Sequence, residues 1–211
     1  MAGQASPYGI RKARKTDCRR IAELYRISSD GVADYIWTKL ARPGEDILDV
    51  GRRRYEREGT PFSYENCTLV ELQGAVIGML VAFPMEIDKE NEEADPVLVP
   101  YSVLEEDRSY YICGMAVEEP HRGRGIGSRL LEEAEDACRR LGFEKLSLIV
   151  FEQNAGARRL YQRHGYVERL RHRVVPHPLI HYTGDALLMV KDLSNARTSN
   201  RVGAGSPAGR T

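Results

Sequence analysis

The chain has 211 residues, and its 31 Lys and Arg residues balance its 31 Asp and Glu residues, so its formal net charge is zero. A neutral chain offers no electrostatic basis for bulk binding of nucleic acid. The longest apolar stretch, Ala75 to Phe83, is too short to span a bilayer, and no apolar signal segment stands at the N-terminus. We therefore expect neither a nucleic-acid partner nor a membrane span, and the length suits one domain.

The cysteine and histidine patterns predict no disulfide framework and no metal site. Four cysteines are scattered along the chain without a C-x-x-C spacing, which suits a reducing compartment and a cytoplasmic location. His172, His177 and His181 lie in a stretch interrupted by Pro176 and Pro178, without a cysteine or clustered carboxylates beside them. We expect no metal.

The first 83 residues predict one strand, three helices and a hairpin. Apolar residues at helical spacing follow Thr16 and Asp17, either of which can cap a helix. The dipeptide Gln73-Gly74 between two apolar runs is a hairpin signal. The other expected elements are a strand at 8–13, helices at 35–40 and 45–58, and strands at 66–72 and 75–83.

The middle of the chain is irregular until a strand expected at 109–117. Residues 88–95 read as an acidic loop, and nothing in the pattern assigns a role to the segment 86–108. These acids could attract a cationic amine, but a solvated loop is the simpler interpretation and the one we favour.

A glycine-rich turn follows that strand and leads into a helical pattern. Such a turn presents bare backbone N–H groups at a helix N-terminus, where they can bind phosphate oxygens. A P-loop would need Lys and then Ser or Thr after Gly127, and a Rossmann fingerprint would need a glycine at Ser128. The pattern Arg-x-x-Gly-x-Gly, in contrast, is filled by Arg122, Gly125 and Gly127.

A helix, a strand and a second helix are expected after the turn. Apolar residues from Ile126 to Leu141 share one helical face, and Gly142 can end that helix. The run 145–151 reads as a strand buried on both faces, and Asn154 is a good cap for a helix ended by Gly165. After Tyr166, the pattern predicts a strand of about eight residues, a loop at 176–184 and a last strand at 185–191.

Two motifs in this order resemble those of the GNAT acetyltransferases, which bind acyl-coenzyme A. The first is the Arg122-Gly125-Gly127 pattern, and the second runs from Asn154 through Leu160-Tyr161 to Gly165-Tyr166. The close resemblance covers residues 110–167. It implies an α/β fold with a mixed, largely antiparallel central sheet, splayed central strands and helices on both faces. We expect a single such domain over 1–191 and a disordered tail over 192–211, where polar and small residues dominate.

The resemblance implies acetyl-CoA as the co-substrate. Backbone groups of 115–117 would hold the pantetheine arm, and amides of 122–128 would hold the pyrophosphate. Arg122, Arg124 and Arg158 remain alternatives for the 3′-phosphate of the nucleotide. The implied binding residues are Met115, Ala116, Val117, Arg122, Gly123, Arg124, Gly125, Ile126, Gly127, Ser128, Asn154, Arg158 and Tyr161.

For catalysis, Tyr161 matches the family tyrosine that can donate a proton to the leaving thiolate. The base stays open. The position where some family members carry a glutamate is Ile149 here, so Glu118, Glu152 and Glu71 are the alternatives, beside a water relay.

The resemblance therefore implies an N-acyltransferase that moves an acetyl group to a primary amine by direct transfer in a ternary complex. The acceptor is open; a small molecule is favoured over a protein N-terminus or lysine, because the aromatic-rich segment 35–65 could close a pocket. The alternative is a noncatalytic acyl-CoA-binding sensor or interaction module. The family resemblance also allows a homodimer.

Overall fold

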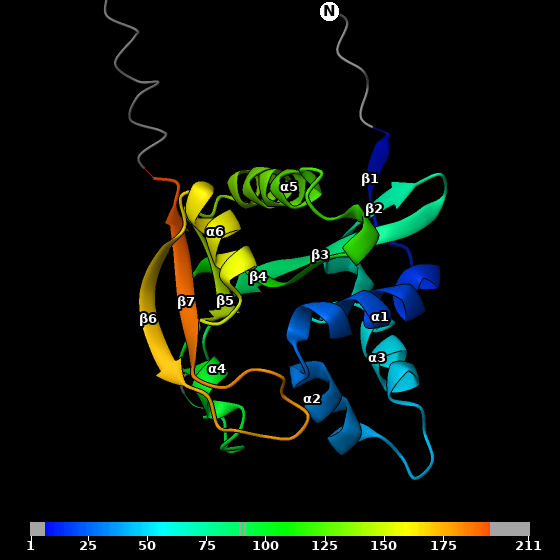
Figure 1. The fold of residues 1–211 in the computed structure, drawn as a ribbon, viewed down its shortest axis with the longest axis vertical. Coiled ribbons are helices and arrows are strands. Elements are labelled where there is room, and N and C mark those ends of the chain that lie inside the picture. Colours follow the sequence, from blue (N-terminus) through cyan, green and yellow to red (C-terminus); the bar gives the residue numbers. More distant parts are fainter. Residues whose placement is uncertain (1–6, 89, 91, 195–211) are drawn as a thin grey trace, which may run out of the picture.

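A computed structural model describes residues 7–88, 90 and 92–194, and a seven-stranded sheet runs through it (Figure 1). The strand order is β1-β2-β3-β4-β5-β7-β6, and every neighbouring pair is antiparallel except β4 and β5. The expectation of a mixed, largely antiparallel sheet is confirmed. The strands are β1 (Tyr8–Lys12), β2 (Cys67–Leu72), β3 (Ala75–Met85), β4 (Ser109–Val117), β5 (Lys145–Phe151), β6 (Val167–Arg173) and β7 (Asp185–Asp192).

Helices cover both faces of this sheet (Figure 1). On one face, α5 and α6 bury Leu130, Leu131 and Tyr161 against the central strands. On the other face, α1, α2 and α3 bury Leu24 and Trp37. The helices are α1 (Cys18–Ser29), α2 (Val32–Leu40), α3 (Ile47–Tyr55), α4 (Val99–Ser102), α5 (Ile126–Arg140) and α6 (Ala155–Arg163), with short 3₁₀ turns at Lys15–Asp17, Tyr64–Asn66 and Glu119–His121.

The two parallel strands β4 and β5 pair over only three residues. Tyr110 to Ile112 lie opposite Leu146 to Leu148, and no pairing between these strands follows. Both strands continue on their other sides: β4 pairs with β3 as far as Val117, and β5 pairs with β7 as far as Phe151. One edge of β4 is therefore open from Cys113 to Val117.

A β-bulge lies where this opening begins. Val81 of β3 pairs with Gly114, and the next residue, Ala82, pairs with Ile112, so Cys113 is the extra residue on β4. A bulge bends its strand and increases the local twist. It accounts for the separation of β4 from β5 beyond Ile112.

Close packing joins α6 to the first turn of α5. A Cβ atom on Gly127 would lie 3.0 Å from Leu160 Cδ2, so the missing side chain lets the two helices approach. The side chain of Asn154 accepts a hydrogen bond from the Ala157 N–H at 3.1 Å, which caps α6 as expected.

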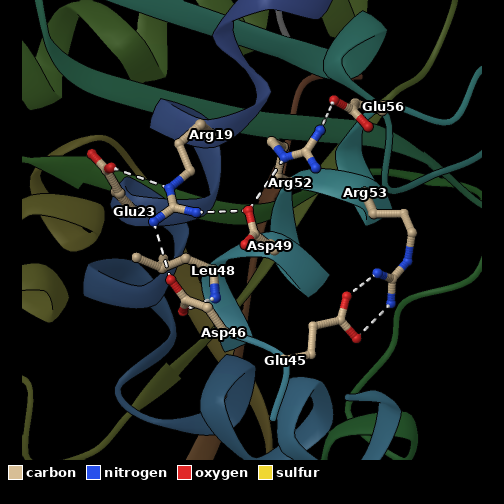
Figure 2. Close-up of polar contacts among 9 residues, drawn as sticks. All are labelled: Arg19, Glu23, Glu45, Asp46, Leu48, Asp49, Arg52, Arg53 and Glu56. Carbon is tan, nitrogen blue, oxygen red and sulfur yellow. Dashed lines mark hydrogen bonds and ion pairs between the residues drawn. The ribbon is translucent and has the colours of Figure 1, made fainter. Parts of the chain in front are cut away.

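On the opposite face, α3 packs against α2 at a glycine inside the helix. A Cβ atom on Gly51 would lie 2.5 Å from the Trp37 ring, so only glycine fits there. A network of ion pairs at the surface also connects α3 to α1 (Figure 2). Arg19 contacts Asp49 at 2.8 Å and Asp46 at 3.2 Å, while Arg53 pairs with Glu45.

Several element bounds differ from the sequence expectations. Helix α2 begins at Val32 rather than near Tyr35, and α3 spans fewer residues than 45–58. The short helix α4 was not predicted, because its four residues carry no periodic signal. The tail expected to be disordered lies outside the described residues from 195 onward. None of the helices described is long and apolar enough to cross a bilayer.

Candidate active site

A cleft of about 1980 Å³ crosses the opened part of the sheet. Its floor is β4 from Tyr111 to Val117, and its walls include β5 from Leu148 to Phe151. At one end it reaches the glycine-rich turn and α6. At the other end it reaches the last turn of α1, helix α4 and the acidic segment that begins at Glu86.

The glycine-rich turn presents backbone donors to this cleft. Gly123 and Gly125 have φ angles of 74° and 80°, and a Cβ on either would meet nothing within 4 Å. Among the described backbone hydrogen bonds, none is donated by the amides of 123–128. Because the first N–H groups of α5 also have no intrahelical acceptor, the turn fits an anionic group such as a pyrophosphate.

Most of the cofactor-binding residues expected from the sequence line the cleft together. Those that do are Met115, Ala116, Val117, Arg122, Gly123, Gly125, Ile126, Gly127, Ser128, Asn154 and Tyr161. Arg124 and Arg158 are not in the lining. The Arg124 guanidinium lies 3.5 Å from the Tyr8 hydroxyl, and Arg158 donates to the Glu152 carbonyl at 3.0 Å. Of the three arginines left open for the 3′-phosphate, Arg122 is therefore the one at the cleft, where Arg163 also lies.

Tyr161 lies on α6 with 8% of its surface exposed, and it lines the cleft. Its ring packs beside Tyr166, with 5.8 Å between the ring centroids. Burial, with a smaller contribution from the Asp30 charge, raises the pKa of Tyr161 to about 12. The hydroxyl therefore stays protonated through neutral pH and can act as a hydrogen-bond donor.

The three carboxylates considered as bases from the sequence lie away from the cleft lining. Glu118 pairs with Arg20 on α1, and Glu71 pairs with Arg11 at 2.8 Å. Glu152 lies 3.9 Å from Arg171 of β6. The structure does not bring Glu118 or Glu152 to Tyr161.

Asp30 is the carboxylate that the fold places at the cleft beside Tyr161. It follows α1 in a left-handed conformation with φ of 50°. Burial raises the pKa of Asp30 to about 6, against smaller opposing effects of the His181 and Arg122 charges. The sequence signal was only an Asp-Gly pair after a helical pattern, which predicts a turn and says nothing of a cleft.

Acidic side chains line the far part of the cleft. Burial, and then the charge of Glu93, raises the pKa of Glu105. Asp95, from the same acidic segment, is instead held by the Tyr35 hydroxyl at 2.8 Å and by Lys39. The acids in the lining, besides Asp30, are Glu86, Asp88, Glu92, Glu93 and Glu105.

A thiol and an arginine also face this part of the cleft. The Tyr25 hydroxyl lies 3.2 Å from Cys113 Sγ, and burial raises the pKa of the Cys113 thiol to about 11. The Arg54 guanidinium lies 4.0 Å from the centre of the Phe62 ring. Cys113 is thus held as a neutral thiol rather than a thiolate nucleophile.

The aromatic-rich segment serves mainly as core. Trp37 and Tyr55 are buried with 1% and 0% exposure, between α1, α2 and α3. Phe62 is the member that reaches the cleft, together with Tyr25 of α1. Within the described ranges, no group of three or more His, Cys, Asp or Glu side chains could hold a metal ion.

Known proteins share both the sequence pattern and the fold. An uncharacterized N-acetyltransferase of Bacillus subtilis, YycN, is 40% identical over 58 residues, which are 28% of this chain and 37% of that relative. The chain thus spans little more than a third of the length of that curated relative.

Two solved structures resemble this one in fold. A polyamine N-acetyltransferase of Drosophila melanogaster, which catalyses the formation of N-acetylagmatine, matches with a TM-score of 0.64 at 15% identity, over 88% of this chain and 100% of that one. YncA of Salmonella typhimurium with its cofactor acetyl-CoA matches with a TM-score of 0.59 at 21% identity, over 90% of this chain and 95% of that one. The model of the Acetyltransferase (GNAT) family matches residues 33–166. Since this match covers more than half of the sequence, the chain belongs to the GNAT acetyltransferase family.

Proposed function

We propose that this protein transfers the acetyl group of acetyl-CoA to a primary amine of a small, cationic molecule. The observation that carries the proposal is the single cleft, which connects the anion-binding turn, the open edge of β4 and an acidic far end. One cleft lets donor and acceptor meet on the same stretch of β4. This geometry supports direct transfer in a ternary complex.

Acetyl-CoA fits the residues of the cleft as they stand. The free amides of 123–128 suit its pyrophosphate, and the unpaired edge of β4 from Cys113 to Val117 can pair with the pantetheine amides. A backbone N–H on this edge can also donate to the thioester carbonyl, on which negative charge develops during acyl transfer.

Tyr161 is our proposed proton donor to the leaving sulfur. Its pKa of about 12 lies well above that of a thiol, about 8.5, so a free tyrosinate would not form easily. A concerted relay, in which Tyr161 gives one proton and receives another, avoids that intermediate. A separate acyl carrier is not needed, and the neutral, hydrogen-bonded thiol of Cys113 is poorly suited to be one.

The acidic end of the cleft supports a cationic small molecule as the acceptor. Five carboxylates line it beyond Asp30, and a cation gains from such a field while an amino acid's carboxylate would be repelled. The Drosophila enzyme of similar fold, a polyamine N-acetyltransferase, makes a cationic amine a reasonable first probe.

Calorimetry with acetyl-CoA, followed by a thiol-release assay over diamines, agmatine, amino acids and N-terminal peptides, tests the proposal. We expect binding and turnover with a cationic small amine. Binding without turnover on any amine would favour the noncatalytic acyl-CoA sensor instead. Absence of binding would overturn the assignment of the anion-binding turn.

A further inference from the structure

The turn after α1 is held rigidly at the edge of the cleft. A Cβ on Gly31, whose φ is 100°, would lie 1.8 Å from the Leu179 carbonyl oxygen, so the backbones are in close contact there. The His181 N–H donates a hydrogen bond to the Asp30 carbonyl at 2.9 Å. Asp30 itself has a positive φ, which costs free energy in a residue other than glycine and persists only where the surroundings impose it. The fold therefore fixes the direction of the Asp30 Cα–Cβ bond.

The same turn is placed beside the part of β4 that would hold the thioester. A Cβ on Gly114 would lie 2.8 Å from Ser28 Oγ and 2.9 Å from the Tyr25 ring, so the last turn of α1 rests directly on the strand. Asp30 follows Ser28 by two residues and lines the cleft with Met115 and Tyr161.

Three polar features of this corner suit an ammonium group. The Asp30 carboxylate has neither a hydrogen bond nor an ion pair with any residue that the structure describes. The Tyr101 hydroxyl of α4 is buried and also lacks a hydrogen-bond partner among those residues. The C-terminal end of α1 adds the negative pole of its helix dipole.

The charged and titratable groups that interact with Asp30 lie on α4, on α6, on the glycine-rich turn and on the β6–β7 loop. The His181 and Arg122 charges favour its ionised form, from the β6–β7 loop and the glycine-rich turn. The hydroxyls of Tyr101, Tyr161 and Tyr182 face it from α4, α6 and the β6–β7 loop, and its charge contributes to raising the pKa of each.

We propose that Asp30 binds the ammonium group of the acceptor and accepts its proton, so that the protein selects strongly basic primary amines. This inference rests on the proposed function and deepens it. A basic amine with a pKa of about 10.4 is neutral in only about 0.04% of molecules at pH 7, so its deprotonation needs a positioned base.

The proton balance closes with the residues at the cleft. The ammonium gives one proton to Asp30, and its freed electron pair forms the bond to the thioester carbon. As the carbon–sulfur bond breaks, the Tyr161 hydroxyl gives its proton to the sulfur. The second proton on the nitrogen then restores Tyr161, and Asp30 releases its proton to solvent.

The decisive variant is Asp30→Asn, measured with two amines of different basicity. Asparagine tolerates the left-handed conformation, so the variant should fold and keep its acetyl-CoA affinity. We expect kcat/KM to fall at least about 100-fold with a diamine of pKa near 10, and less than about 10-fold with a primary amine of pKa near 6, which is already neutral. A structural role would lower both rates equally and would overturn the inference.

The pH profile gives a second readout. In the wild type, kcat/KM should decline below about pH 6, where Asp30 becomes protonated, and this limb should stay in place among different amines of pKa near 10. Asp30→Asn should remove it, and Asp136→Asn, at an exposed site on α5, should not. Loss of the limb in Glu118→Gln or Glu152→Gln, with Asp30→Asn unchanged, would assign the base elsewhere. Wild type that binds acetyl-CoA but acetylates no amine would contradict the proposed function itself.

Discussion

The two halves of the cleft offer different kinds of groups to a ligand. The cofactor half, formed by β4, the glycine-rich turn, α5, β5 and α6, comes from one continuous segment and offers mainly backbone groups. The acceptor half, formed by α1 to α4 and by residues 86–88, 92–98 and 174–184, offers side chains from segments far apart in the sequence. Backbone recognition depends on where glycine is allowed, whereas side-chain recognition can change without altering the fold.

The largest expected effect comes from a substitution confined to the cofactor half. Gly125→Glu places a side chain at a φ of 80° and a negative charge at the site assigned to the pyrophosphate. We expect acetyl-CoA affinity to fall more than about 100-fold, about 2.7 kcal/mol or more, by calorimetry.

Gly44→Glu is the matched control. Gly44 has a φ of 77°, and a Cβ there would likewise meet nothing within 4 Å, but it lies outside the cleft lining. Gly44→Glu introduces the same backbone strain. If it leaves acetyl-CoA affinity unchanged, the loss in Gly125→Glu comes from the site and not from strain. Equal losses in both variants would contradict the assignment of the turn.

The next largest effect concerns Tyr161, which lies where the two halves meet. Tyr161→Phe should lower kcat by about 10²–10⁴-fold, the range for loss of a general acid, and leave acetyl-CoA affinity nearly unchanged. Tyr64→Phe, whose hydroxyl contacts Glu58 at 3.2 Å away from the cleft, serves as the control. Steady-state and single-turnover rates measure the loss of kcat. A wild-type rate in Tyr161→Phe would mean that Tyr161 only packs against its neighbours.

A third effect concerns the stability of the acceptor half. The pKa of Asp30 is raised from 3.8 to about 6, so its ionised form destabilises the folded state above pH 6, and this cost disappears as the pH falls toward 4. Asp30→Asn should therefore raise the free energy of unfolding at pH 8 and not at pH 3.5, by less than about 3 kcal/mol because Asp30 is only partly buried and solvent screens its charge.

Asp34→Asn, in contrast, should lower the free energy of unfolding at neutral pH. It removes the pair in which the Arg26 guanidinium contacts Asp34 at 2.6 and 2.8 Å. Urea unfolding at the two pH values measures both variants. A loss of stability in Asp30→Asn at pH 8 would mean that its carboxylate is favourably held.

The smallest effect comes from the ion-pair network between α1 and α3 (Figure 2). Its side chains are about half exposed, with Arg19 at 41% and Asp46 at 51%. Exposed pairs contribute little, so Arg19→Gln should cost less than about 1 kcal/mol and lose most of that cost in high salt. Thermal unfolding at two salt concentrations measures it, and a larger, salt-independent loss would indicate a packing role for Arg19.

Elements of this fold that depend on local pattern can be predicted from the sequence. The strands at 109–117 and 145–151 and the cap at Asn154 were all predicted, because a strand, its glycine turn and its capped helix are local features. Asp30 and Tyr101, in contrast, carry no local signal that places them at the cleft. Their roles depend on α1 resting on Gly114 and on a loop some 150 residues later, and no periodicity records such contacts.

The bulge in β4 also affects which way the rest of the strand faces. Side chains alternate along a strand, yet Cys113 and Gly114 both face α1, after which Met115 and Val117 turn toward α5 and Ala116 toward α1. Regular alternation through Cys113 and Gly114 would place Met115 and Val117 on the α1 side, so the bulge is what keeps both on the α5 side. Deleting Cys113 would leave those faces unchanged and would remove the bulge that bends β4 away from β5. The opening between β4 and β5 thus begins at one residue of β4 that has no partner on β3.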